Sequence, residues 1–234
     1  MFDFGGRIAV ITGAAGALGQ VVADSLLRAG ARCAVLDLDA DRLRQRFPEG
    51  EACLALGVDL TDAEAVRDAV GKVTERFGAV HLLANVAGGF RMGATVQDAD
   101  DATWDLMMRL NARSVFHMSR AVIPAMLEAG FGRIVNVSAR AAVEPKGRMS
   151  PYIASKAAVL ALTQSIAAEN RHTPVHVNCT PPGTVDTPQN RADMPDSDFS
   201  KWVTTAALAD VILFLMSDAA RSVNGAAVPV YGES

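Results

Sequence analysis

Short apolar segments alternate along the chain with longer segments that are rich in Ala and Leu. The short segments are nearly continuous runs of Val, Ile, Leu and Ala rather than a strict alternation of apolar and polar residues. We therefore expect each of these strands to be buried on both faces. Strands are predicted at Arg7–Thr12, Arg32–Leu38, Val80–Val86, Arg133–Val137, Val175–Cys179 and Ala226–Tyr231.

The longer segments predict helices whose ends carry capping residues. Gly30 and Gly78 follow two of them, as C-cap residues do, and Pro151 stands in the first turn of a third. Helices are predicted at Gly16–Ala29, Asp62–Phe77, Pro151–Asn170 and Thr205–Met216. Because strands and helices alternate throughout residues 1–234, we expect one α/β domain, a single doubly wound parallel sheet with helices on both faces. Ligands of such a sheet bind beyond the carboxyl ends of its strands.

Composition and charge narrow the class of protein. Half of the 234 residues are hydrophobic, which excludes a disordered chain. A net charge of −4 argues against nucleic acid as the main partner. No apolar run reaches the ~18 residues of a membrane span, and the first residues lack signal-peptide features, so we expect a cytoplasmic protein with no membrane partner. The scattered histidines indicate no metal site, and the three cysteines are expected to be reduced thiols.

A glycine-rich segment, Thr12–Gly19, follows the first predicted strand and opens the first predicted helix. Its first glycine permits a tight turn, the middle of the segment lets the backbone approach a diphosphate, and its last glycine allows the helix to pack closely on the sheet. Free N–H groups and the helix dipole would then face the diphosphate. The pattern predicts a dinucleotide site, with Gly13, Ala15, Gly16, Ala17, Leu18 and Gly19 as cofactor-binding residues.

Asp37 ends the second predicted strand, 18 residues after Gly19. A carboxylate at this position accepts hydrogen bonds from the ribose hydroxyls of adenosine and repels a 2′-phosphate. The glycine-rich segment has no Arg or Lys to bind that phosphate, and Leu38 and Asp39 come next. We therefore expect NAD(H) to be preferred over NADP(H), with Leu38 beside the cofactor. The alternative for Asp37 is a solvated carboxylate at a strand end.

Two further segments at strand ends are candidate cofactor contacts. Asp59 and Leu60 would contact adenine, although a simple helix cap at Asp59 or Thr61 explains the same pattern. The segment from Asn85 to Gly89 ends another predicted strand. There Asn85 would hold neighbouring backbone groups, and the small Ala87 and Gly88 would let the cofactor lie across the sheet.

Tyr152 and Lys156 are four residues apart and therefore share one face of a predicted helix. An ammonium near a phenol favours the phenolate, so we expect the pKa of Tyr152 to fall below its usual value of about 10. The tyrosine would then exchange protons near neutral pH, as the acid–base partner of a hydride transfer. Lys156 would also hold the nicotinamide ribose. An exposed amphipathic helix face is the alternative.

With these elements in this order, the chain resembles the short-chain dehydrogenase/reductase family over nearly its whole length. The resemblance implies a Rossmann fold and hydride transfer between a nicotinamide and a small carbonyl or alcohol substrate, with Tyr152 and Lys156 as the catalytic pair. It implies that Asn111 supports a proton-relay water, unless this residue is a buried helix asparagine bonded only to backbone. It also implies nicotinamide contacts at Pro182, Gly183, Val185 and Thr187.

Two departures from the family pattern concern the glycine-rich loop and the catalytic serine. Ala17 replaces the middle glycine of the loop, and Gly16 stands one place earlier. The family's catalytic Ser lies 13 residues before the Tyr, where this chain has Ala139, and Ser138 comes one residue early. Because neighbouring residues of a strand face opposite sides, Ser138 would act as a catalytic donor only if the strand end bulges. We favour Ala139 in the site, which implies a weaker ketoreductase or a substrate that does not need this donor.

A third departure concerns the substrate. Short segments at 86–90, 138–142 and after Thr187 resemble the dihydropteridine-reductase-like branch, which implies NADH-dependent reduction of a quinonoid dihydropterin, whereas Asn111 favours ordinary carbonyl or alcohol chemistry. A catalytically weak dinucleotide sensor and a methyltransferase are the alternatives from other classes. Candidate substrate contacts are Ala139, Phe90, Met149 and Met194. Further candidate pocket residues, because they flank the motifs, are Arg91, Met92, Phe199 and Trp202. Ordinary packing explains the Met and aromatic residues equally well. Segments 99–129 and 150–170 are apolar enough to predict a homodimer or homotetramer, and in the family they form a four-helix interface.

Overall fold

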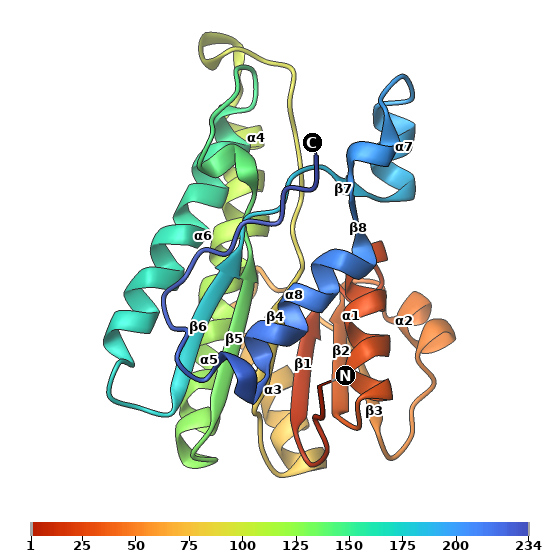
Figure 1. Ribbon diagram of the computed structural model, residues 1–234, viewed down its shortest axis with the longest axis vertical. Coiled ribbons are helices and arrows are strands. Elements are labelled where there is room, and N and C mark those ends of the chain that lie inside the picture. Colours follow the sequence, from red (N-terminus) through yellow and green to blue (C-terminus); the bar gives the residue numbers. More distant parts are fainter. Residues whose placement is uncertain (1, 234) are drawn as a thin grey trace.

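The computed structural model describes residues 2–233, and within them six parallel strands form one sheet in the order β3-β2-β1-β4-β5-β6. The strands are β1 (Ile8–Thr12), β2 (Arg32–Asp37), β3 (Cys53–Gly57), β4 (Leu82–Asn85), β5 (Gly132–Val137) and β6 (Val175–Thr180). After β1 the chain builds toward the β3 edge, and from β4 onward it builds toward the β6 edge (Figure 1). This order confirms the predicted doubly wound α/β fold and places its switch point between β1 and β4.

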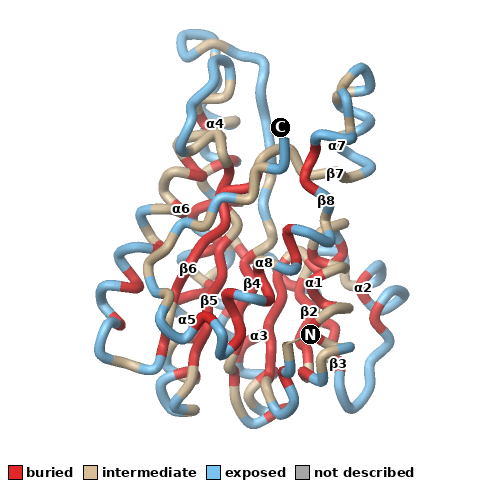
Figure 2. Tube along the Cα trace, viewed as in Figure 1, coloured by how far each residue is buried: buried red, intermediate tan, exposed pale blue. Residues whose placement is uncertain are grey.

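Helices cover both faces of the sheet, as predicted. One apolar cluster joins α1 (Ala17–Arg28), α2 (Ala40–Arg46) and α8 (Thr205–Met216) to sheet residues such as Val35. The other joins α3 (Ala63–Phe77), α5 (Ser114–Glu128) and α6 (Ser150–Glu169) to residues such as Ile134 on the opposite face. Figure 2 shows the strands as the most buried part of the chain, which explains their continuous apolar sequence.

Several elements lie outside the predicted set. Helix α4 (Asp101–Met107) runs through a π-helical turn (Met108–Arg113) into α5. After β6 come β7 (Val185–Asp186), α7 (Pro188–Asp193) and β8 (Val203–Thr204), and β7 pairs with β8 beyond the carboxyl end of the main sheet (Figure 1). Single 3-10 turns occupy Val96–Asp98, Arg140–Ala142, Phe199–Lys201 and Asp218–Ala220.

The predicted strand Ala226–Tyr231 is wrong as a regular strand. The segment follows β6 in parallel but forms only two isolated bridges, Cys179 with Ala227 and Pro182 with Val230. Cys179 N donates to Ala226 O at 2.9 Å, and Gly183 N donates to Val230 O at 2.9 Å. Pro181 is the residue between these donors whose N–H would continue the ladder, and because proline has no N–H, the ladder is interrupted there. In the part of the chain from residue 2 to residue 233, no helix has the length and apolar character to span a bilayer.

Candidate active site

The glycine-rich segment makes a tight turn from β1 into α1. Gly13 has a φ of 66°, and a Cβ there would lie 2.8 Å from the backbone of Ala87. A Cβ on Gly19 would collide with the carbonyl oxygen of Gly13. The N-cap residue Gly16 offers no side-chain cap, and the first turn of α1 contains no acidic residue. The turn therefore leaves the positive end of α1 open to an anion, a property that fits a dinucleotide diphosphate.

Asp37 ties the end of β2 to this turn. Its carboxylate accepts hydrogen bonds from Ala15 N at 3.0 Å and Leu38 N at 2.8 Å, and it remains partly exposed. The Leu38 side chain is 75% exposed next to it. Asp39 N adds a third, long bond at 3.5 Å. A carboxylate has about four acceptor positions, so three backbone bonds leave room for a hydroxyl donor.

Asp59 caps a turn and does not cap the helix. It accepts from Thr61 N at 2.8 Å, which lowers its pKa, whereas the N-cap of α3 is Asp62, bonded to Glu64 N and Ala65 N. The helix-cap alternative for Asp59 or Thr61 is therefore wrong. Leu60 is buried, and its carbonyl oxygen lies 3.1 Å from Nδ1 of His117.

Thr12, rather than Asn85, holds the backbone that follows β4. Its Oγ1 accepts hydrogen bonds from Val86 N and Ala87 N, both at 3.1 Å. Asn85 is buried, and its Nδ2 donates to Oδ1 of Asn136 at 2.8 Å; Nδ2 of Asn136 donates in turn to Oγ1 of Thr163 at 2.9 Å. Thr12 was not predicted in this role from the sequence, although its position at the end of the first strand is a signal that could have indicated it.

Asn111 connects three segments of the site. It lies in the π-helical turn, is fully buried, and exchanges two hydrogen bonds with the backbone of Gly89, at 2.9 and 3.0 Å. Its Nδ2 also donates to Oγ of Ser155 at 2.9 Å, and Ser155 donates to the carbonyl oxygen of Tyr152 at 2.7 Å. Asn111 is therefore bonded to a side chain as well as to backbone, so the backbone-only alternative is wrong.

Gly88 lies against two of the predicted site residues. A Cβ added there would approach Oδ1 of Asn111 to 2.7 Å and Nζ of Lys156 to 3.1 Å. The absence of a side chain at Gly88 is thus what allows the segment after β4 to pack on both groups.

Burial sets the protonation of Lys156 and Tyr152. Lys156 is buried, its Nζ donates to Val137 O at 2.8 Å, and burial lowers its pKa to about 8. Burial raises the pKa of Tyr152 to about 12. The predicted lowering of the tyrosine pKa is therefore wrong for this structure, because loss of hydration outweighs the influence of a lysine whose own charge is disfavoured. The phenol ring also meets the ring of Phe90 edge-on, with centroids 4.8 Å apart.

The end of β5 continues without a bulge. Ser138 N donates to Thr180 O at 2.9 Å and Arg140 N donates to Pro182 O at 2.7 Å, two residues further on in both segments. Ser138 is buried, and its hydroxyl donates to Lys156 O at 2.8 Å. The condition for Ser138 as a catalytic donor, a bulge, is thus not met, and its only proton is already bonded. Ala139 takes the following position, in an extended conformation.

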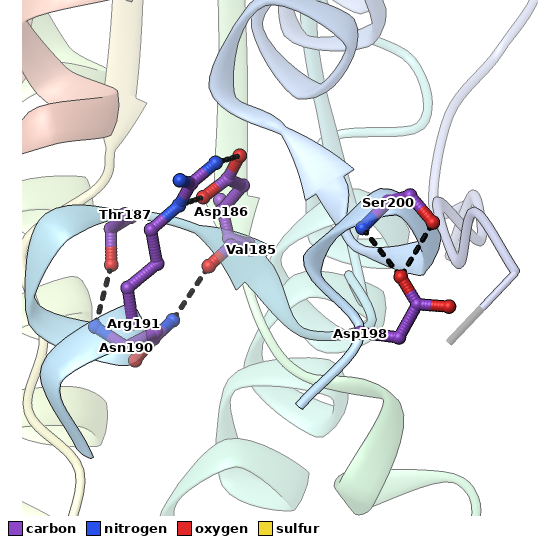
Figure 3. Close-up of polar contacts among 7 residues, drawn as sticks. All are labelled: Val185, Asp186, Thr187, Asn190, Arg191, Asp198 and Ser200. Carbon is purple, nitrogen blue, oxygen red and sulfur yellow. Dashed lines mark hydrogen bonds and ion pairs between the residues drawn. The ribbon is translucent and has the colours of Figure 1, made fainter. Parts of the chain in front are cut away.

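The segment after β6 is held by local contacts. Thr187 caps α7 by accepting from Asn190 N at 3.1 Å, and Nδ2 of Asn190 donates to Val185 O at 2.7 Å. Arg191 forms two bonds with Asp186, at 2.6 and 2.8 Å, and they lower the pKa of that carboxyl (Figure 3). Val185 and Thr187 are thereby fixed in one hydrogen-bonded unit, which Pro182 and Gly183 connect to β6. Met149 and Met194 are partly buried at the start of α6 and the end of α7, and their substrate contacts stay predictions.

Comparisons with known proteins agree with this arrangement. A family model described as short chain dehydrogenase matches residues 7–198. The chain is 34% identical to the 2-(R)-hydroxypropyl-CoM dehydrogenase of Xanthobacter autotrophicus over 97% of both chains. It is 33% identical to the D-threitol dehydrogenase of Mycolicibacterium smegmatis, over 99% of this chain and 94% of that one. A short-chain type dehydrogenase/reductase from Mycobacterium ulcerans has a similar solved structure, with a TM-score of 0.94 and 26% identity over 99% of this chain and 90% of that chain.

Proposed function

Because the chain belongs to the short-chain dehydrogenase family, we propose that it oxidises a small hydroxy compound, or reduces the matching carbonyl, with Tyr152 as the residue that moves the proton. The dinucleotide, when bound, accepts or supplies the hydride. The observation that carries the proposal is the bonded network in which Asn111, Ser155 and Tyr152 join the segment after β4 to α6. This network fixes the backbone of the helical turn that carries Tyr152, and acid–base catalysis requires a proton donor at a defined position.

The proton path follows from the chemistry of the phenol. In carbonyl reduction Tyr152 gives its proton to the substrate oxygen as the carbonyl carbon receives hydride. In alcohol oxidation the phenolate takes that proton as hydride leaves the carbon. Burial raises the pKa of Tyr152, so the phenol is protonated at neutral pH, which is the form that donates in carbonyl reduction. Oxidation then requires an alkaline medium or an additional positive charge near the phenol.

The residues around the glycine-rich turn support a nicotinamide dinucleotide as the cofactor. The open first turn of α1 would hold the diphosphate, and Asp37 would accept from the adenosine ribose. A carboxylate at this position disfavours a 2′-phosphate, so NAD(H) is the proposed partner and NADP(H) the weaker one. Lys156, buried beside Gly88, would bind the nicotinamide ribose.

Hydroxy compounds are favoured over a dihydropterin as substrates. The named relatives are dehydrogenases of a hydroxypropyl compound and of threitol. Asn111 is bonded to the helix that carries Tyr152, as carbonyl and alcohol chemistry in this family implies. The reading as a catalytically weak sensor rests only on the missing hydroxyl at Ala139.

Single-turnover measurements test the proposal. The protein would be mixed with NADH and a panel of small ketones, aldehydes and quinonoid dihydropterin, and NADH oxidation followed by absorbance. Oxidation with a carbonyl compound, lost in Tyr152→Phe, supports it. Tight NADH binding without turnover of any compound would favour the sensor, and turnover of the pterin alone would favour pterin reduction.

Self-association belongs to the same proposal. Helices α4 and α5 leave Trp104, Leu106, Phe116 and Leu127 exposed. Apolar side chains gathered on neighbouring helices indicate a surface that a second subunit covers. Light scattering after size exclusion should give a dimer or tetramer, and a monomer at all concentrations would reject this part of the proposal.

A further inference from the structure

Cations without a carboxylate partner lie on the two connections that border Tyr152. Arg91 follows β4, and Lys146 and Arg148 precede α6; all three side chains are exposed. Among the ion pairs formed within residues 2–233, none involves these three. Arg140, on the same connection as Arg148, is paired with Glu144 at 2.7 Å. The connections therefore carry positive charge that the protein leaves unneutralised.

Arg148 is held in an unusual conformation. Its φ of 63° is the only positive value at a residue other than glycine in the described part of the chain. Gly93 N donates to Arg148 O at 2.8 Å, and Nη1 of Arg148 donates to Gly93 O at 3.2 Å. L side chains rarely adopt such a backbone conformation, and it is maintained here by a two-way bond between the connections.

The connection after β4 contacts the tyrosine ring, and the connection before α6 leads into the helix that carries it. Phe90 contacts the ring of Tyr152, and Nη1 of Arg91 donates to Phe90 O at 2.9 Å. Arg148 stands four residues before Tyr152, just ahead of the first turn of α6. Figure 1 shows the connection after β4 and the connection before α6 running to the same end of the molecule, beyond the carboxyl ends of the strands.

The segment around α7 has the opposite charge pattern. Arg191 is paired with Asp186 (Figure 3), and Lys201 lies 3.7 Å from Asp198, so the charges of both cations are matched. Asp193 and Asp196 add further negative charge to that segment. An anion near Tyr152 would therefore be attracted toward Arg91 and Arg148 and repelled from α7.

We propose that the substrate carries an anionic oxygen group, such as a carboxylate, which Arg148 binds together with Arg91. The inference rests on the proposed function and names the substrate class of the same site. A guanidinium has five N–H donors in a planar fork that matches a carboxylate, and the bond to Gly93 O uses only one of them. Fixing Arg148 by its backbone and by Gly93 orients the remaining donors before the substrate arrives.

The test compares hydroxy acids with their neutral esters. Oxidation of 3-hydroxybutanoate, 4-hydroxypentanoate and 5-hydroxyhexanoate would be measured with NAD⁺, each beside its methyl ester. The chain lengths differ because the span from Tyr152 to Arg148 selects one of them. We expect the best acid to have a kcat/KM at least tenfold above its ester. Arg148→Gln should raise the KM for that acid at least tenfold and change the ester parameters less than twofold.

Matched variants separate binding of the anion from positioning of the loop. The bond from Gly93 N to the backbone carbonyl of residue 148 does not involve the side chain, so Arg148→Gln keeps this link between the two connections. Lys146→Gln removes the same charge two residues away and should leave the KM for the acid within twofold. Arg91→Gln should reproduce the effect of Arg148→Gln in weaker form. Circular dichroism would verify that each variant is folded.

Three results would overturn the inference. The first is a higher kcat/KM for the ester than for the acid at every chain length. The second is an equal loss of kcat/KM for acid and ester in Arg148→Gln. The third is a rise in the KM for the acid in Lys146→Gln that equals the rise in Arg148→Gln. Turnover of esters alone would leave the proposed function intact. If neither acids nor esters react, thermal shifts decide the anion site, and the single-turnover panel of carbonyl compounds decides the proposed function. Stabilisation by 4-oxopentanoate in the original protein, lost in Arg148→Gln, would support it, and no stabilisation would reject it.

Discussion

The side-chain amide of Asn111 donates a hydrogen bond to the hydroxyl of Ser155 at 2.9 Å. Both residues are buried, and the bond joins the π-helical turn between α4 and α5 to the helix of Tyr152. The amide is also bonded to Gly89, so one side chain sets the spacing of three segments.

Removal of this amide should affect both stability and turnover. Asn111→Ala leaves Gly89 N and O without their partner and removes one of the two hydrogen bonds of the Ser155 hydroxyl, which costs on the order of 1–3 kcal/mol for each polar group left unpaired. We expect a clear loss in urea-induced unfolding free energy and a lower kcat. Ser155→Ala should have a smaller effect on both. Ser165→Ala, an exposed serine of the same helix, is the control and should match the original protein.

Substitution of Tyr152 by Phe tests the proton donor. The variant keeps the ring that contacts Phe90 but has no hydroxyl, so kcat should fall by roughly 100-fold or more, as expected for loss of general acid–base catalysis. The affinity for NADH, measured by fluorescence, should be unchanged. In the original protein the oxidation rate should rise toward alkaline pH, because the pKa of Tyr152 is raised to about 12. Unaltered turnover in the variant would reject the assignment.

Lys156 should make stability depend on pH in a defined direction. Burial lowers its pKa from 10.5 to about 8, so between these values the unfolded chain binds the proton more than the folded one does. The free energy of unfolding due to this group therefore rises as pH increases from about 8 to about 10. Urea titrations at several pH values give the slope of the unfolding free energy against pH, and this slope is compared between the original protein and Lys156→Met. Parallel slopes would show that the lysine is not desolvated.

The missing hydroxyl at position 139 should be restorable. Ala139→Ser places a donor in the position that the strand register gives to the family's catalytic serine. A new bond to a substrate carbonyl of about 1–3 kcal/mol corresponds to a gain in kcat/KM of roughly 5- to 150-fold. Ser138→Ala, which loses only the bond to Lys156 O, should lower thermal stability without a comparable change in specificity. A neutral or harmful Ala139→Ser would indicate a substrate that does not use this donor.

Asp37 should control the choice of cofactor. Asp37→Ala removes the charge that disfavours a 2′-phosphate, so the ratio of the Kd for NADPH to that for NADH should move toward one. The variant also loses the bonds to Ala15 N and Leu38 N and should be less stable. Asp39→Ala, two residues later at the N-cap of α2, serves as the control for a general charge effect. A native preference for NADPH would contradict the role given to Asp37.

The sequence predicts the sheet well because its strands are buried on both faces, a property that appears directly as continuous apolar runs. It fails at residues 226–231, where the apolar pattern is right but the neighbouring Pro181 lacks the N–H that would continue the ladder. The sequence also does not predict that the pKa of Tyr152 is raised, because the spacing of Tyr152 and Lys156 indicates that they are close but gives no information on how far each is removed from water. The hydrogen bond between Arg148 and Gly93 joins residues that are far apart in the chain, so no local sequence pattern predicts it.

The buried bonds from Asn85 to Asn136 and from Asn136 to Thr163 have a mechanical consequence for α6. Thr163 lies 11 residues after Tyr152, close to three full helical turns of about 3.6 residues each, so the two side chains project from the same side of the helix. A rotation of α6 about its axis, or a slide along it, would break the bond to Asn136 before it displaced the phenol far. The side chains of Asn85, Asn136 and Thr163 therefore anchor the middle of α6 to the sheet, and this anchor also fixes the position of the helix end that carries Tyr152.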